Sequence, residues 1–284
     1  MNLRNLPFLL ILLVVVAAQA PAQTTADSLA IARARWEITQ PQPGIRCLSA
    51  SFDTLYGVPQ HVTILEINPH RYRFGLLVHT PKETTSQAAR QAGAAAAING
   101  SYFNMSKGTS ICYTRRAGET LCTTTATGAL GSVSNAAAQI KGGRLRITAW
   151  DKTTDEARRQ RADDILVSGP LMLLAGDTCS LAGCNQNFIE ARHPRSALAR
   201  KSDGQVLLIA VAGRFPRRAE GMRIVELAHL ARMLGAVEAM NLDGGGSTTL
   251  WDEVEGVVNR PTDNRTFDNQ GERKVANSIA AFRK

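Results

Sequence analysis

Apolar and polar positions alternate along the chain in short runs that are bounded by Pro, Gly or Asn. Beyond Leu48, the runs His61 to Ile67 and Arg71 to His79 have the length and the boundaries of β-strands. The apolar stretches Ala94 to Ile98 and Ala236 to Leu242 are typical of buried strands. This part of the chain is therefore predicted to be rich in sheet.

Two helices are predicted between these strands. Thr84 and Gln87 have the spacing of a capping box, and Gly93 is placed to end the helix that they begin. Apolar residues recur at helical spacing from Ile224 to Leu234, and Gly235 follows. The second helix is therefore amphipathic and is expected to pack on a sheet.

A hairpin is predicted around Asp203 and Gly204, which join the strand-like runs Arg195 to Arg200 and Gln205 to Ala212. Strands and helices are thus mixed, which predicts an α+β or α/β fold with a mixed sheet, layered and covered by packed helices. No internal repeat or long low-complexity tract interrupts the chain after the lead-in, so one domain is predicted over residues 48–284.

An export signal is predicted ahead of this domain. Arg4 precedes an apolar run from Leu6 to Ala18 and small residues up to Ala22, which is typical of a secretory signal peptide over residues 1–22. The run is shorter than the roughly 20 apolar residues of a transmembrane helix. We therefore expect a secreted or periplasmic protein without stable membrane insertion, and a lead-in segment of low order over residues 23–47.

Five cysteines follow the predicted signal peptide. Cys112 with Cys122 and Cys179 with Cys184 are spaced for two local disulfides, which would leave Cys47 unpaired. Reduced thiols and a zinc site are the alternatives. No pair has C-x-x-C spacing and no His-x-x-x-His follows, so disulfides are favoured over zinc.

The net charge of +9 becomes +8 without Arg4, and it is spread along the chain without a dense basic run. This balance suits anionic partners in general. Aromatic residues make up only 5% of the chain and no recognition motif is present, which argues against nucleic acid. A phosphorylated glycan fits an exported basic protein better.

The most informative segment is Asn241 to Trp251, where one carboxylate, Asp243, precedes three glycines. Glycines let a ligand approach the main chain closely, and successive N–H groups can cradle an anion. Gly244, Gly245 and Gly246 therefore predict a phosphate cradle. The alternative is a tight loop in which the carboxylate caps the next turn.

Three other strand ends carry candidate residues. Asn99 and Gly100 end an apolar strand, where the amide could bind a sugar hydroxyl or simply form a turn. Ser168 and Gly169 interrupt another apolar run. Arg195 offers the paired donors that phosphate favours, although an arginine at a strand start can also form a surface ion pair.

Together these segments resemble the phosphodiester glycosidase family over about Leu48 to Phe282. The resembling segments are Asn99-Gly100, Ser168-Gly169-Pro170, Arg195-Ser196-Ala197, Asn241 through Ser247, and Val275-Ala276-Asn277. Ser101 and Ala199 stand where the family often has glycine, and Lys274 stands where it often has proline. These departures loosen the prediction of the substrate.

The resemblance implies a hydrolase that cleaves the sugar–phosphate bond of a glycosyl-1-phosphodiester, such as an N-acetylglucosamine-1-phosphodiester, and releases sugar and a phosphomonoester. It implies that Asp243 is the base, nucleophile or oxocarbenium stabiliser, and that Arg195 stabilises the departing phosphate. The implied substrate-binding residues are Asn99, Gly100, Ser168, Gly169, Gly244, Gly245, Gly246, Ser247 and Asn277.

Several alternatives stay open. A second catalytic carboxylate is not identified, and Asp263 and Asp268 are better explained as solvated loop residues. No cofactor is predicted, and a divalent cation held by Asp243 and Asn277 is open because no ligand spacing demands it. The rival function is a non-catalytic module in which the glycine cradle and Arg195 hold a phosphorylated envelope or exopolysaccharide glycan. A serine hydrolase is disfavoured because no G-x-S-x-G motif is present.

Overall fold

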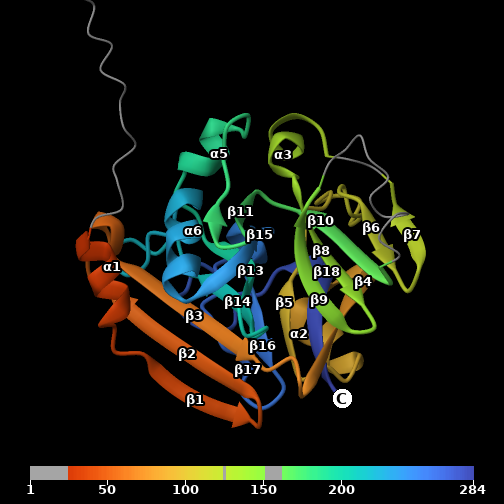
Figure 1. Ribbon diagram of the computed structural model, residues 1–284, viewed down its shortest axis with the longest axis horizontal. Helices are drawn as coiled ribbons and strands as arrows, with labels where there is room; N and C mark the ends of the chain where they lie inside the picture. Colours follow the sequence, from red (N-terminus) through yellow and green to blue (C-terminus); the bar gives the residue numbers. More distant parts are fainter. Residues whose placement is uncertain (1–24, 124–125, 151–161) are drawn as a thin grey trace, which may run out of the picture.

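The computed structural model describes residues 25–123, 126–150 and 162–284, which form three sheets and a few short helices (Figure 1). The predicted α+β fold of a single domain is confirmed. The sheets are not mixed as predicted, because all the strand pairs in these residues are antiparallel. The predicted signal peptide lies outside the described residues.

The largest sheet has eight strands in the order β1-β2-β3-β14-β13-β15-β11-β12. Its strands are β1 Glu37–Gln42, β2 Ile45–Phe52, β3 Gln60–Ile67, β14 Val206–Val211, β13 Arg195–Lys201, β15 Ala236–Asn241, β11 Leu171–Leu174 and β12 Asp177–Thr178. The predicted hairpin is β13 with β14, in the register Arg195 to Val211. The low order expected for residues 23–47 is wrong for its described part, because α1 (Thr25–Ala32) and β1 are ordered and β1 pairs with β2 at the edge of the sheet.

Two sheets of five strands complete the fold. The first has the order β7-β6-β10-β8-β9, with β7 Glu119–Cys122, β6 Thr114–Arg116, β10 Asp164–Ser168, β8 Ala136–Lys141 and β9 Arg144–Ala149. The second has the order β17-β16-β5-β18-β4, with β17 Gly256–Val257, β16 Leu250–Asp252, β5 Ala96–Asn99, β18 Lys274–Arg283 and β4 Tyr72–Thr84. All three sheets contribute to one buried cluster, which includes Leu198, Ile147 and Ile279.

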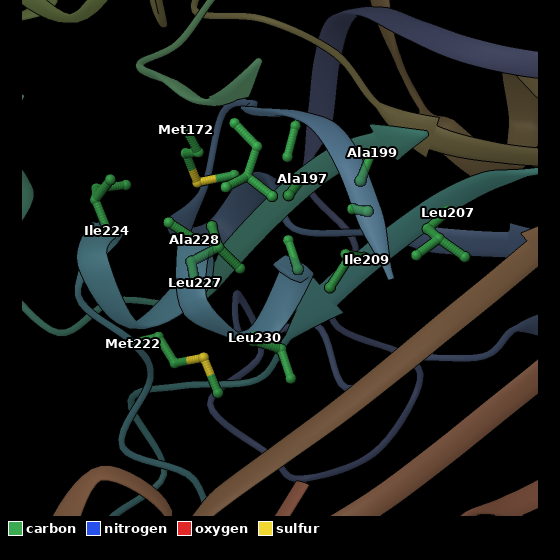
Figure 2. Close-up of a cluster of buried hydrophobic side chains, with 14 of the residues drawn as sticks. Met172, Ala197, Ala199, Leu207, Ile209, Met222, Ile224, Leu227, Ala228 and Leu230 are labelled. Atoms are coloured by element: carbon green, nitrogen blue, oxygen red, sulfur yellow. The ribbon is translucent and has the colours of Figure 1, made fainter. Parts of the chain in front are cut away.

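The amphipathic helix α6 (Ile224–Met233) packs on the eight-stranded sheet, as its apolar spacing predicts. Figure 2 shows Leu227 and Leu230 of this helix beside Ala197 and Ile209 of the sheet. On the second five-stranded sheet, α2 (Thr85–Gln91) begins at the predicted cap, where the Thr84 hydroxyl accepts the Gln87 amide hydrogen bond at 3.2 Å.

Two further short helices lie near the strand ends, α3 (Gly128–Val133) and α5 (Gln186–Glu190), and single 3₁₀ turns occupy η1 (Leu55–Gly57) and η2 (Gly245–Ser247). No helix within the described ranges is long and apolar enough to cross a membrane.

The predicted disulfides are wrong, because none of the five cysteines, all of which the structure describes, forms a disulfide. Cys112 is buried against the Ser134 hydroxyl, whereas the thiol of Cys122 donates to the Ser110 carbonyl. Cys184 belongs to the hydrophobic cluster beneath α6, and Cys179 packs against the cluster between the sheets. Neighbours in sequence thus point into different parts of the core.

Candidate active site

The glycine segment follows β15 and is held by the ends of other strands. The Leu242 amide donates to the Ser196 carbonyl at 2.8 Å, and the Asp243 amide donates to the Gly100 carbonyl at 2.9 Å. A Cβ atom on Gly244 would lie 2.5 Å from the Pro194 carbonyl oxygen, so only glycine fits there. Gly245 has a φ of +62°. The backbone therefore requires the glycines that the sequence singles out.

Asp243 is a partly exposed residue whose carboxyl group is enclosed by this loop. Burial raises the pKa of Asp243 to about 6, while the Ser247 hydroxyl, the positive charge of Arg273 and the Gly244 amide act in the opposite direction. The carboxyl is thus mostly ionised at pH 7 and gains a proton near pH 6. A pKa in this range is one that acid–base chemistry uses.

Two arginines that were not selected from the sequence lie against the glycines. A Cβ atom on Gly245 would be 3.0 Å from Nη2 of Arg214, which is exposed and has a φ of +65°. Its guanidinium makes no hydrogen bond or salt bridge within the described part of the chain. Arg214 is therefore a free cation beside the glycine loop, on a backbone conformation that costs free energy.

The second arginine, Arg273, packs on Gly246 together with Asp263. Its Nε donates to Asp263 at 2.9 Å and its Nη2 at 2.5 Å. Asp263, which the sequence suggests is a solvated loop residue, thus lies at the glycine loop. Asp268 instead accepts hydrogen bonds from Asn264 and Gln270 in an exposed turn.

The guanidinium of Arg195 is already hydrogen-bonded within the protein, whereas its predicted role requires it to bind the departing phosphate. Its side chain is buried, with Nε donating to Met222 at 2.8 Å and Nη2 donating to Phe188 and Ala191 at 3.0 and 2.6 Å. All three acceptors are backbone carbonyls. Burial lowers its pKa to about 10, so it stays charged. These contacts favour a role in which Arg195 holds the surrounding loops in place. The pKa of the neighbouring His193 is lowered by burial and by the charges of Arg195 and Arg214.

The predicted sugar ligand Asn99 is also occupied. Its Oδ1 accepts hydrogen bonds from the Ser196 hydroxyl at 2.7 Å and the Thr249 amide at 3.1 Å, and its Nδ2 donates to the Asp243 carbonyl at 2.6 Å. Asn99 therefore ties β5 and β13 to the glycine segment. It positions Asp243 instead of offering a free amide.

Gly100 and Asn277 form a second tie. Asn277 Oδ1 accepts the Ser101 amide hydrogen bond at 2.7 Å, and its Nδ2 donates to the Ser110 hydroxyl at 2.8 Å. A side chain on Gly100 would collide with that amide. The amide oxygen that was considered for a divalent cation is thus already bound.

Asn241, just before the glycine loop, hydrogen-bonds Gly169, which follows Ser168 in the chain. Its Nδ2 donates to the Gly169 carbonyl at 2.8 Å and to the Tyr102 hydroxyl at 3.1 Å. Buried polar atoms without a hydrogen-bond partner among the described residues include Asn241 Oδ1 and Ser168 Oγ. These atoms are available to a ligand or to ordered water.

Most of the predicted site residues therefore lie around the glycine loop, but many of them hold the loop in place instead of offering free groups to a ligand. No group of three or more His, Cys, Asp or Glu side chains suited to a metal occurs in the described residues. Arg214 could have been noticed as a cation just after the predicted strand that ends at Ala212, and Arg273 as a cation just before the resembling segment Val275-Ala276-Asn277. Their contact with the glycines depends on distant chain segments and was not visible in the sequence.

The predicted cradle of free amides is wrong for Gly245, whose amide donates to the Pro194 carbonyl at 2.9 Å. A carboxyl with a pKa near 6, set beside two arginines, is suited to a sugar bonded to a phosphate. The model of the family described as phosphodiester glycosidase matches residues 92–282, and the chain belongs to this family. The resemblance seen in the sequence is confirmed.

Curated relatives agree with this assignment. The chain is 25% identical over 182 residues to N-acetylglucosamine-1-phosphodiester alpha-N-acetylglucosaminidase of Mus musculus, and 24% identical over 182 residues to the protein of that name from Bos taurus. Each match covers 60% of this chain, but only 34% and 33% of the relatives. The chain therefore corresponds to about a third of their length.

Solved structures share the fold. The zebrafish N-acetylglucosamine-1-phosphodiester alpha-N-acetylglucosaminidase catalytic domain, auto-inhibited by its pro-peptide, superposes with a TM-score of 0.66 over 88% of both chains at 16% identity. A hypothetical protein from Synechocystis superposes with a TM-score of 0.67 over 88% of this chain and 64% of its own, also at 16% identity.

Proposed function

We propose that the protein is an exported hydrolase that cleaves the sugar–phosphate bond of a glycosyl-1-phosphodiester, with an N-acetylglucosamine-1-phosphodiester as the model substrate. The observation that carries the proposal is the juxtaposition of Asp243 with the glycine loop and the free guanidinium of Arg214. Family membership supports the reaction class. The predicted signal peptide supports export.

The proposed reaction breaks the bond between the anomeric carbon and the phosphodiester oxygen. That oxygen keeps the bonding electrons and leaves as part of a phosphomonoester, while the oxygen of water becomes the new hydroxyl of the sugar. Ionised Asp243 either takes the proton of the attacking water or adds to the anomeric carbon before water releases it. Both routes consume one water and use the carboxylate form.

Negative charge grows on the departing phosphate, and we assign its stabilisation to Arg214, whose guanidinium lies against Gly245. Arg273 is held by Asp263 and contributes its positive field to Asp243. The buried Ser168 and Ser247 hydroxyls are proposed contacts for the substrate. Asn99, Gly100, Asn277 and the cis-linked Gly169 are proposed to support substrate binding by holding the loop.

The alternative of a non-catalytic glycan-binding module uses the same cradle but requires no carboxyl with a raised pKa. Both proposals are tested by measuring the release of reducing sugar from an N-acetylglucosamine-1-phosphodiester, with wild type, D243N and D268N. Asp268 is an exposed carboxylate of a nearby loop and serves as the matched control. Turnover that is lost only in D243N supports the hydrolase, whereas substrate binding without turnover in the wild type supports the module.

A further inference from the structure

A cavity of about 490 Å³ lies apart from the glycine loop, between the middle of β4, the β6–β7 hairpin and the segment that follows Asn104. Its size is within the range of about 300–1,000 Å³ that is usual for small-molecule sites. None of the predicted site residues lines it. The cavity therefore needs an explanation of its own.

Hydroxyl groups dominate its polar lining. The hydroxyl side chains are Thr80, Thr109, Ser110, Thr114 and Thr123, and one imidazole, His79, completes the polar set. A hydroxyl both donates and accepts hydrogen bonds, which matches ligands that are themselves polyols. The lining contains no acidic side chain, lysine or arginine.

His79 does not add a charge. It is buried, its Nε2 lies 3.2 Å from the Ser278 hydroxyl, and burial together with the positive charge of Arg116 lowers its pKa to about 4. Arg116 and Glu83 line a neighbouring cavity, which shares Val78, His79 and Thr80 with the hydroxyl-lined one. At neutral pH the hydroxyl-lined cavity is thus polar and uncharged, in contrast to the arginine-flanked glycine loop.

Aliphatic groups form the rest of the wall. Val78, Ala276 and Leu121 contribute apolar surface, and Leu121 is 47% exposed although it is a large hydrophobic residue. A sugar ring presents C–H groups on its faces and hydroxyls around its edge. A wall that combines aliphatic carbon with several hydroxyls complements both parts.

The cavity and the active site share one structural element. Ser110 lines the cavity and accepts the hydrogen bond of Asn277, whose other amide atom holds Ser101. Gly100, next to Ser101, holds the amide of Asp243. The two sites are therefore adjacent but have separate linings and opposite electrostatic character.

We propose that this hydroxyl-lined cavity is a second binding site, specific for an uncharged sugar unit. Binding there requires no hydrolysis, so the proposal stands or falls independently of the catalytic function. It would let the protein hold a neutral sugar of a glycan while the glycine loop engages a phosphorylated one.

The test is a titration of the signal-free chain with free N-acetylglucosamine, and separately with inorganic phosphate, followed by amide chemical-shift mapping. We expect the sugar to shift the amides of Thr80, Thr109, Ser110 and Thr114. Phosphate is expected to shift only the glycine loop around Asp243. D243N is titrated in parallel, because a change confined to the active site should depend on that carboxyl.

The variant T109V removes one exposed hydroxyl of the cavity and keeps the side-chain shape. A hydrogen bond contributes about 0.5–1.5 kcal/mol, so a roughly 2- to 12-fold loss of sugar affinity is expected. T120V is the matched control, since Thr120 is an exposed residue of β7 outside the cavity. Absence of sugar shifts at the cavity, equal affinity in T109V and wild type, or phosphate binding at the cavity would each overturn the proposal.

Discussion

Replacing Arg214 by alanine tests which arginine acts on the phosphate. The guanidinium of Arg214 lies against Gly245 and has no hydrogen bond or salt bridge in the described chain, so its removal breaks none of these polar contacts. A hydrogen bond to a charged group contributes about 1.5–3 kcal/mol. Because about 1.4 kcal/mol is a factor of ten in rate, R214A should lower kcat/KM by roughly 10- to 150-fold.

The assay is steady-state hydrolysis of the N-acetylglucosamine-1-phosphodiester, combined with thermal unfolding of each variant. R217A is the matched control, because Arg217 is exposed on the same loop and also has a positive φ, of +62°. R217A should retain activity, and both variants should unfold near the wild-type temperature.

R195A should instead unfold at a lower temperature. Loss of the guanidinium removes hydrogen bonds to the buried Met222 carbonyl and to the part-buried carbonyls of Phe188 and Ala191, and a hydrogen bond to a charged group contributes about 1.5–3 kcal/mol. The reasoning is refuted if R214A keeps full kcat/KM while R195A loses turnover and remains as stable as the wild type. That outcome would restore the direct role of Arg195 that the sequence suggested.

Three further predictions follow from the pKa values and the thiols. Burial raises the pKa of Asp243 to about 6, so its ionisation destabilises the fold as the pH rises from 4 through 6. D243N should therefore raise Tm at pH 8 and leave it unchanged at pH 3. Equal Tm shifts at both pH values would contradict the raised pKa. Activity that depends on the Asp243 carboxylate should fall below pH 6, which gives the pH–rate profile an acidic limb. R273M should move this limb to higher pH, because it removes the positive charge that lowers the pKa of Asp243. R283M is the control, since it removes an exposed ion pair with Glu253 and should leave the limb in place. Since none of the described cysteines forms a disulfide, Tm should be the same with and without reductant, and a fall with reductant would show a disulfide.

Local pattern was sufficient for the elements that define the fold. The β13–β14 hairpin follows from Asp203 and Gly204, and α6 follows from apolar spacing that ends before Gly235. The pairing of β1 with β2 was missed, because residues 37–42 carry little apolar pattern and their order comes from a neighbouring strand. Sequence spacing likewise misjudged the cysteines, whose side chains enter separate hydrophobic clusters.

The same limit explains why the site was found but its roles were not. The glycines and Asp243 lie together in the chain, so their chemistry could be read locally. The role of Asn99 depends on Ser196 and Thr249, which are 97 and 150 residues away, and that of Arg195 depends on carbonyls of other loops. Polar residues that mark a site in the sequence can be retained because they position the reacting group, not because they touch the substrate. A residue such as Arg214, which has a strained backbone and no hydrogen-bond or salt-bridge partner among the residues that the structure describes, is the stronger candidate for substrate contact.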